Sequence, residues 1–97
     1  MDIDDIVVTL RSLKQVVRDE FDIELVGIFG SMAKGNYSEK SDVDVLVKGG
    51  PSADQEEFNA AELFLSSQVH RAVSLRCFYM LRKNFFKDEI AHCLIRL

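Results

Sequence analysis

The sequence predicts a two-layer domain of the α+β or α/β class, in which helices pack against a small β-sheet. The chain has 97 residues, which suits a single domain over residues 1–97. Hydrophobic residues make up 47% of it, so a disordered chain is excluded. Helix-like and strand-like hydrophobic patterns follow one another in the order helix, strand, strand, helix, strand, helix. This order does not determine whether neighbouring strands run parallel.

Hydrophobic spacing and breaker residues set the bounds of each predicted element. In chain order the elements are a helix at 3–20, a strand at 23–29, a short helical turn at 32–36, a strand at 42–48, a helix at 53–67, a strand at 69–79 and a closing helix at 84–97. The first helix has apolar residues at helical intervals, and Asp2 or a neighbouring residue is expected to cap it. Its acidic first turn is favourable because the helix dipole is positive at that end.

Short apolar runs predict the strands, and glycines mark where they end. Residues 23–29 are rich in Ile, Val and Phe, as expected for a buried strand. Gly30-Ser31 ends that run, and Gly35 is the expected stop of the short helical turn. The second strand ends at residues 49–51, a Gly-Gly-Pro sequence that breaks regular structure.

The second half of the chain continues the alternation of helix and strand. The inner face of the helix at 53–67 is expected to hold Phe58, Ala61, Leu65 and either Glu62 or Leu63. The closing helix at 84–97 is predicted from five apolar residues at helical spacing, Phe86, Ile90, Cys93, Leu94 and Leu97. Both helices are therefore expected to face the sheet.

Two short motifs separated by ten residues point to the chemistry of the chain, Gly30-Ser31 after the first strand and Asp42-Val43-Asp44 at the second. Side chains alternate along a strand, so Asp42 and Asp44 point to the same face, about 7 Å apart along the backbone. The valines that alternate with them point the other way, into the core. The sequence thus places two carboxylates beside a small, amide-rich turn.

This combination suits a nucleoside triphosphate and its magnesium. Two carboxylates on one strand face can chelate one divalent cation or bridge two, and magnesium prefers oxygen ligands shared with substrate phosphates. The Gly30-Ser31 turn can present amides and a hydroxyl to the terminal phosphates, and Lys34 adds a positive charge. Either motif alone is usually a solvent-facing turn or strand edge. Two acids on an apolar strand, however, cost stability unless a cation compensates them.

The same stretch resembles the signature of the minimal nucleotidyltransferases in the DNA polymerase beta superfamily. The matching residues are Gly30, Ser31, Ala33, Lys34, Gly35, Ser41, Asp42 and Asp44. The resemblance is close over about residues 25–48, and it implies an α+β fold with a mixed sheet, like the polymerase beta palm. It also implies ATP or another nucleoside triphosphate as substrate, two Mg²⁺ ions, and transfer of a nucleoside monophosphate to an acceptor hydroxyl.

By this resemblance, Gly30, Ser31 and Lys34 bind the nucleotide, while Asp42 and Asp44 bind metal and are catalytic. Many small members of the superfamily resemble the antitoxin half of a toxin–antitoxin pair. The implied partner is a helical toxin of the HEPN ribonuclease class. The implied reaction is transfer of AMP to a tyrosine of that toxin.

One residue departs from the family's pattern. The family usually carries a third carboxylate in a Val-Asp-Leu-like context on a later strand, and here that stretch is Val73-Ser74-Leu75. Serine is neutral and a weak metal ligand, so a second metal would be poorly held, and losing such a group typically costs on the order of 10²–10³ in rate. Glu57 or Glu62 from the middle helix, or a partner protein, are the candidate replacements. The alternative is a catalytically depleted module that binds nucleotide or a protein partner.

Charge and composition exclude several function classes. The chain has a net charge of −4 and no basic tract, so it is a poor candidate for gripping a long nucleic acid. It has no run of about 18 apolar residues, so no membrane span is predicted. The N-terminus lacks the regions of a signal peptide, and Cys77 and Cys93 are interpreted as reduced core residues. These features favour a cytoplasmic protein.

Other conspicuous side chains have plainer interpretations. His70 and His92 are expected at the surface or an interface rather than as metal ligands. Tyr37 lies between the two motif halves and is expected to be a loop residue rather than a platform for the base. Four aromatic residues close together are expected mostly in the core, with an exposed patch for a homodimer or a helical partner as the alternative. They are Phe78, Tyr79, Phe85 and Phe86.

Overall fold

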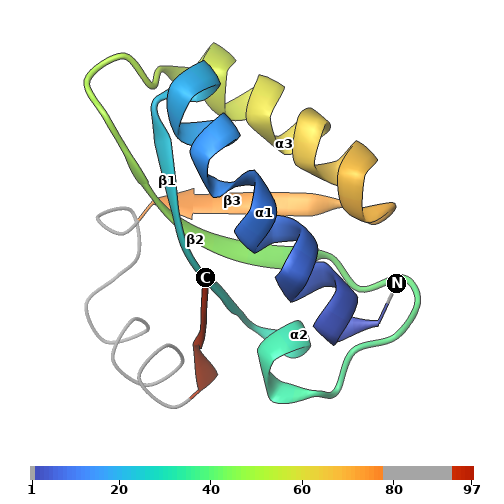
Figure 1. Cartoon of the computed structure of the whole chain (residues 1–97). Coiled ribbons are helices and arrows are strands. Elements are labelled where there is room, and N and C mark those ends of the chain that lie inside the picture. The colour runs from blue at the N-terminus through green and yellow to red at the C-terminus, as the bar shows by residue number, and fades with distance from the viewer. Residues whose placement is uncertain (1, 78–92) are drawn as a thin grey trace.

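Within residues 2–77 and 93–97, which the computed structural model describes, four strands form one sheet and two long helices cover one of its faces (Figure 1). The elements are α1 (Ile3–Phe21), β1 (Ile23–Phe29), α2 (Ser31–Lys34), β2 (Val43–Gly49), α3 (Gln55–Val69), β3 (Val73–Cys77) and β4 (Ile95–Arg96). From α1 to β3 the predicted order is confirmed. The bounds differ from the predicted ones by a few residues, most at the start of β3.

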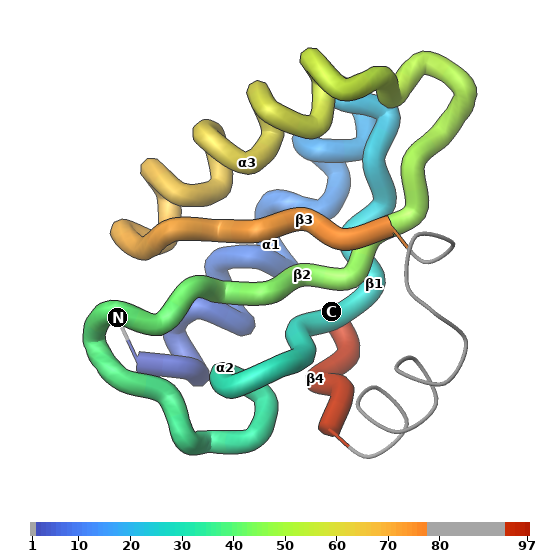
Figure 2. Tube along the Cα trace, turned by 180° about the vertical axis from the view of Figure 1, so that it is seen from behind, coloured from blue at the N-terminus to red at the C-terminus, as the bar shows by residue number. Residues whose placement is uncertain are grey.

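The sheet is mixed, with the strand order β3-β2-β1-β4. Strand β1 runs antiparallel to both β2 and β4, whereas β2 and β3 run parallel. Parallel neighbours need a crossover connection, and α3 provides it here. Seen from behind, β2 and β3 lie in front of α1 and α3, so both long helices lie on the same side of the sheet (Figure 2). The α+β prediction is confirmed, and the sheet keeps one face free of these helices.

Helix α1 begins at the predicted cap. The Asp2 carboxylate accepts a hydrogen bond from the Asp5 N–H at 2.9 Å, which satisfies one of the donors that a helix start leaves without a partner. The helix ends where Asp22 turns into the left-handed region with φ 57°, and the Asp22 N–H donates to the Arg18 carbonyl at 3.1 Å. Capping and the acidic first turn therefore fix both ends of the helix.

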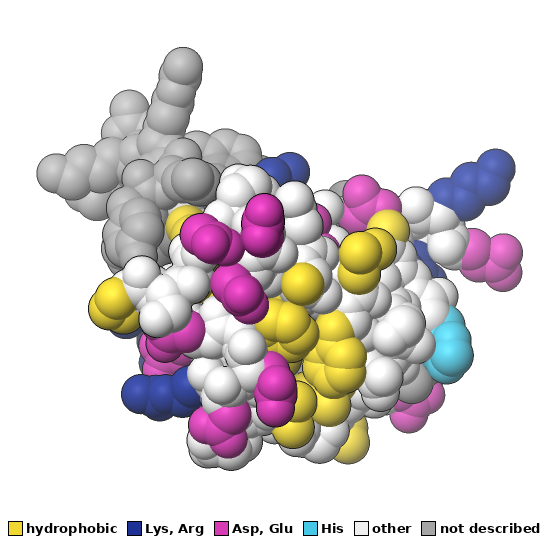
Figure 3. Space-filling view, turned by 90° about the horizontal axis from the view of Figure 1, so that it is seen from above, with side chains coloured by type: hydrophobic (Ala, Val, Ile, Leu, Met, Phe, Trp, Pro, Cys, Tyr) yellow, Lys and Arg dark blue, Asp and Glu magenta, His cyan; other side chains and the backbone are white. Residues whose placement is uncertain are grey.

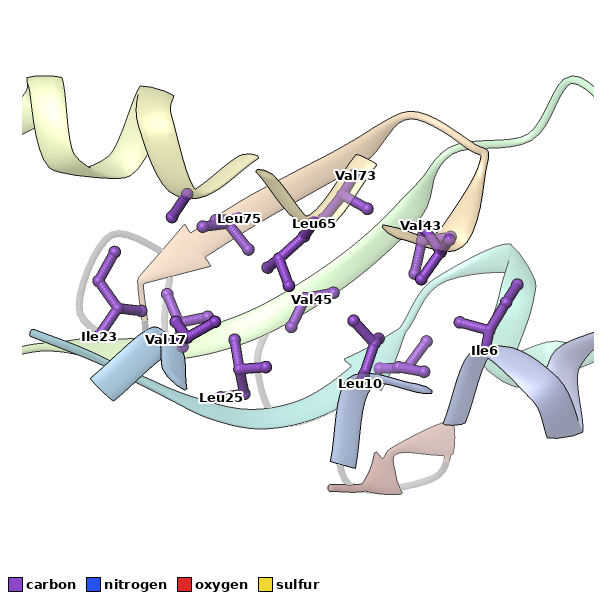
Figure 4. Close-up of a cluster of buried hydrophobic side chains, with 14 of the residues drawn as sticks. Ile6, Leu10, Val17, Ile23, Leu25, Val43, Val45, Leu65, Val73 and Leu75 are labelled. Carbon is purple, nitrogen blue, oxygen red and sulfur yellow. The ribbon is translucent and has the colours of Figure 1, made fainter. Parts of the chain in front are cut away.

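The hydrophobic core fills the space between the helices and the sheet (Figure 4). The alternate valines of β2 are fully buried on this side, as predicted. They pack with residues from both helices and from β1, including Ile6, Leu10, Val17, Ile23, Leu25, Ala61 and Leu65. Burying one such aliphatic side chain contributes about 1.5–3 kcal/mol. The core thus turns Asp44 to the opposite face of β2, where Leu46 is also buried and packs with Phe29.

Helix α3 also covers the outer edge of β3. The Val73 N–H donates to Ser66 Oγ at 3.0 Å, and the Leu75 N–H donates to Glu62 Oε1 at 2.9 Å. Of the two residues proposed for the inner face of this helix, Glu62 turns to the sheet and Leu63 is 75% exposed. These bonds matter because an edge strand otherwise presents unpaired backbone groups to other chains.

The outer surface of the helix layer combines acidic and hydrophobic side chains (Figure 3). Phe21 of α1 and Phe64 of α3 bring their ring centroids to 5.9 Å across the two helices. Acidic side chains gather beside them, where the end of α1 approaches the start of α3. Among the described residues, no helix has both the length and the hydrophobicity needed to cross a bilayer.

The predicted closing helix is wrong at its C-terminal end. Residues 95–96 form β4, which pairs antiparallel with Gly27 and Ile28 of β1, and the Leu97 N–H donates to the Val26 carbonyl at 3.0 Å. Short apolar runs fit a helix or a strand equally well, and the outer edge of β1 supplies backbone partners that only a strand can use. Gly27 permits the pairing, since a Cβ there would stand 2.6 Å from Leu94 Cδ1.

Several earlier expectations fall outside the described residues. They are the helix at 84–92, the end of the predicted third strand at 78–79, the aromatic residues Phe78, Tyr79, Phe85 and Phe86, and His92. Within the described residues, His70 is exposed at the end of α3, as expected. Cys77 and Cys93 are both free thiols; burial raises the pKa of the Cys77 thiol, so this cysteine is an unreactive core residue.

Candidate functional site

Gly30 and Asp44 meet on the sheet face opposite the long helices. The register pairs Phe29, the last residue of β1, with Asp44 of β2. Gly30 follows with φ 73° and ψ −151°, a conformation that is essentially restricted to glycine. A Cβ at Gly30 would stand 2.6 Å from Asp44 Oδ2. Both its conformation and the available space therefore require glycine, and the turn lies directly against the carboxylate.

The predicted short helical turn is confirmed as α2, which starts at Ser31 and ends at Lys34. The Lys34 N–H donates to the Gly30 carbonyl at 3.1 Å, closing this single turn. Gly35 ends it in the left-handed region with φ 80°. Ser31 is half-buried and Lys34 is exposed, so the hydroxyl lies in the turn and the ammonium group extends from its end.

The two carboxylates lie at the start of β2. The strand begins at Val43, so Asp42 is the residue just before it and is exposed, while Asp44 is half-buried on the strand. Burial raises the pKa of Asp44 above its usual value; the Arg76 guanidinium opposes this increase, and the Asp42 carboxylate adds to it. The two acids are thus close enough to repel each other, as the alternation of strand side chains predicts.

Ser74 occupies the position next to Asp44 on the neighbouring strand. The parallel register pairs Asp44 with Ser74 and Leu46 with Arg76. Both Ser74 and Arg76 alternate with the buried residues of β3, so they share with Asp44 the sheet face opposite the long helices. The register therefore places beside Asp44 the residue at which the resemblance implies a third carboxylate.

Neither glutamate that was considered as a replacement acid lies at this face. Glu62 is held at the outer edge of β3 by its bond to the Leu75 N–H. Glu57 lies in the first turn of α3 and lines a surface hollow with residues 18–22. Both residues belong to the helix layer, on the other side of the sheet from Asp44. The described residues therefore offer no acid in place of Ser74.

Arg71 is a contributor to the site that the sequence analysis missed. Its Nη1 donates to the carbonyl oxygens of Ser38 at 2.6 Å and Ser41 at 2.8 Å. Its guanidinium carbon also lies 5.8 Å from the centroid of the Tyr37 ring. Arg71 thus holds the loop that leads into Asp42 from a position about 30 residues further along the chain. No local pattern indicated this, because the contact depends on where the start of β3 lies.

The contacts of Arg71 also account for Tyr37. The ring of Tyr37 lies beneath the guanidinium of Arg71 and packs against the hydrophobic core. The loop continues as a turn in which the Ser38 N–H donates to Ser41 Oγ at 2.9 Å. Tyr37 is therefore a packed loop residue, in agreement with the plainer of its two interpretations.

The donor set at this face fits one magnesium ion better than two. Asp42 and Asp44 supply carboxylate oxygens, the ligands that magnesium prefers, and a divalent cation would offset the repulsion between them. Among the described residues, no group of three or more His, Cys, Asp or Glu side chains comes together to hold a metal. In the part of the chain that the structure describes, the two aspartates are therefore the available protein ligands, and phosphate and water oxygens would complete the coordination.

Comparison with known proteins identifies the family. A family model described as a nucleotidyltransferase domain matches residues 10–97. The chain belongs to this nucleotidyltransferase family. The resemblance inferred from the two motifs is thereby confirmed.

Two curated relatives extend the comparison of this nucleotidyltransferase domain. One is a putative protein adenylyltransferase of Methanocaldococcus jannaschii, 30% identical over 86 residues, which cover 89% of this chain and 88% of the relative. The other is the protein adenylyltransferase MntA of Thermococcus cleftensis, 30% identical over 87 residues, which cover 90% of this chain and 83% of the relative.

Two solved structures share the fold of this nucleotidyltransferase domain. A putative minimal nucleotidyltransferase matches with a TM-score of 0.73 and 24% identity, covering all of this chain and 97% of that one. A toxin–antitoxin complex with AMP-PNP matches with a TM-score of 0.69 and 18% identity, covering 89% of this chain and 69% of that one. At these identities the likeness concerns the fold.

Proposed function

We propose that this nucleotidyltransferase domain binds ATP with Mg²⁺ and transfers AMP to a hydroxyl group of a protein partner. The observation that supports this best is the contact between Gly30 and the Asp44 carboxylate. It brings a turn suited to phosphate and a carboxylate suited to a cation to one place. The names of its relatives, protein adenylyltransferases, supply the class of acceptor.

Each candidate residue has a role that follows from its position. The Ser31 hydroxyl and the backbone of the Gly30-Ser31 turn bind the terminal phosphates, and the exposed Lys34 ammonium group offsets part of their charge. Asp42 and Asp44 hold Mg²⁺, which when bound neutralises charge on the triphosphate. Together these residues orient the α-phosphate towards an acceptor on the sheet face opposite the long helices.

The proposed transfer makes one bond and breaks one. The acceptor oxygen attacks the α-phosphorus, and the bond from that phosphorus to the bridging oxygen breaks, so that pyrophosphate leaves with the bonding electrons. The proton of the acceptor hydroxyl passes to solvent, because the neutral Ser74 beside Asp44 is not a base. AMP is then held by a phosphodiester bond to the partner.

The proposed biological role is that of an antitoxin acting in the cytoplasm. One relative is the protein adenylyltransferase MntA, and one structural neighbour is a toxin–antitoxin complex with AMP-PNP. By analogy, the partner is a helical toxin of the HEPN class, and its modified residue is a tyrosine. This proposal would be tested on the product of the neighbouring gene.

A second function is favoured by one observation, the neutral Ser74 in register with Asp44. A domain without the third carboxylate can retain nucleotide or partner binding after transfer has been lost. In that case the protein would silence its partner by association alone.

Labelled ATP separates the two functions. Incubating the domain with ATP labelled on the α-phosphate, Mg²⁺ and the neighbouring gene product is expected to label that product. Asp44→Asn should abolish the labelling. Calorimetry measures the binding of ATP and Mg²⁺ directly. Binding without any transfer supports the depleted module, and the absence of ATP binding contradicts the transfer function.

A further inference from the structure

The number of metal ions that this site can hold depends on the residue beside Asp44 on the neighbouring strand. By the family resemblance, a second divalent cation would be held by a further carboxylate on the strand beside Asp44. The parallel register gives one residue of β3 that position, and it is Ser74. A serine hydroxyl brings no negative charge, so it cannot balance a second cation there.

No other described residue supplies the missing charge. Glu62 is bonded to the Leu75 N–H at the outer edge of β3, and Glu57 faces the end of α1. The described residues contain no cluster of three or more metal-ligating side chains. The ligands that the described residues provide at this face are thus the two aspartates.

A positive side chain lies on the same face of β3 instead. Arg76 lies two residues beyond Ser74, on the same face of β3, and is exposed. The parallel register pairs it with Leu46, two residues along β2 from Asp44, so Arg76 and Asp44 share one face of the sheet. Arginine stays protonated at any physiological pH. The positive charge of the Arg76 guanidinium repels a second metal ion. Among the described residues of β3, the guanidinium is then the one positive charge on this side of Asp44.

We propose that this site takes one divalent cation with its nucleotide, on Asp42 and Asp44, and that Arg76 supplies the positive charge on the acceptor side. The inference rests on the proposed nucleotide binding and adds the number of metal ions and the role of Arg76. In this arrangement the guanidinium attracts the oxygens of the α-phosphate as negative charge develops on them. Ser74 is neutral, which leaves Arg76 without a carboxylate at the neighbouring position to pair with.

The test counts metal ions per bound nucleotide. The probe is Mn²⁺ with α,β-methylene ATP, whose α–β bridge is not cleaved, and free Mn²⁺ is measured by electron paramagnetic resonance. We compare the wild type, Ser74→Asp, Arg76→Gln and the double variant Ser74→Asp/Arg76→Gln. Arg18→Gln, an exposed arginine on α1, is the matched control for loss of one positive charge.

The wild type should bind one Mn²⁺ per nucleotide and the double variant two. With Ser74→Asp alone, the second ion should bind at least about 10-fold more weakly than in the double variant, because the guanidinium pairs with the new carboxylate. Two ions per nucleotide in the wild type would overturn the inference, as would equal binding of the second ion in the single and double variants. If no variant binds the nucleotide, the proposed function fails instead.

A rate measurement tests the role of Arg76 separately. In single-turnover transfer, Arg76→Gln should lower the rate on the order of 10²-fold, while the dissociation constant for the nucleotide changes little. An unchanged rate would overturn this role. Circular dichroism and thermal melting of each variant show whether it is folded before either assay is interpreted.

Discussion

The Asp44 carboxylate lies against Gly30 so closely that a Cβ on that glycine would stand 2.6 Å from Asp44 Oδ2. The residue that follows β1 and the second residue of β2 thus form one feature, a turn that lies directly against a carboxylate. The close approach of Asp44 and the backbone conformation at Gly30 both depend on the absence of a side chain. Their contributions to binding and stability can be separated by comparing substitutions at different glycines.

Gly30→Ala is expected to weaken nucleotide binding strongly and to lower the free energy of unfolding. The backbone strain at φ 73°, ψ −151° costs about 1–3 kcal/mol, and Asp44 must also move aside. Calorimetry with Mg²⁺ and the ATP analogue, together with urea unfolding, measures both effects. Gly35→Ala is the matched control, since Gly35 has φ +80° but nothing within 4 Å of an added Cβ. It should cost about 1 kcal/mol of stability with little loss of binding.

Arg71→Met is expected to weaken the binding of Mn²⁺ with the ATP analogue about 10-fold, equivalent to 1.4 kcal/mol. The variant keeps an apolar stem against Tyr37 but loses the bonds to the Ser38 and Ser41 carbonyls, so the loop before Asp42 is no longer held. Arg71→Lys should restore part of the affinity. Arg11→Met is the control, because Arg11 donates to the Arg96 carbonyl at 2.8 Å, away from that loop. Equal affinities for both methionine variants would contradict this role for Arg71.

Asp44→Asn is expected to raise the melting temperature of the ligand-free protein at pH 7 while abolishing cation binding. Burial raises the pKa of Asp44 above the ordinary 3.8. The folded state therefore holds this proton more tightly than the unfolded state, and stability is lost as the pH rises from the unfolded value through the raised, folded one. Below that pH range Asp44 is neutral in both the folded and the unfolded state. The difference in melting temperature between the wild type and Asp44→Asn should therefore disappear.

Melting curves of the wild type and Asp44→Asn across the acidic range measure this effect. Asp42→Asn is the matched control. Because Asp42 is exposed, this substitution should raise the melting temperature less than Asp44→Asn does. If Asp44→Asn is less stable than the wild type at pH 7, the favourable contacts of the carboxylate outweigh the free-energy cost of burying it.

Glu62→Ala is expected to lower the free energy of unfolding by about 1–3 kcal/mol, because the Leu75 N–H loses its acceptor. The affinity for Mn²⁺ and nucleotide should stay the same, since Glu62 lies at the edge of β3 rather than beside Asp44. Glu62→Gln retains a carbonyl acceptor and should remain close to the wild type in stability. A loss of metal affinity in Glu62→Gln would instead assign this residue to the metal site.

Local sequence predicted the elements that have their own start and stop signals. The cap at Asp2 and the left-handed glycine at Gly35 lie where the pattern placed them. The end of the chain was predicted wrongly, because Ile95 and Arg96 become a strand only through pairing with the outer edge of β1. Arg71 was missed for a related reason, since its partners lie about 30 residues earlier in the sequence.

The sequence by itself determined the family of this protein, the alternation of faces on β2 and the absence of an acid at position 74. These follow from residue type and from the two-residue period of a strand, which need no knowledge of neighbours. Only the tertiary structure decided that Ser74 and Arg76 stand beside Asp44, that Glu62 is held at the sheet edge and that Arg71 fixes the loop before Asp42. Strand register and helix placement bring these residues together, and both depend on burying one common core.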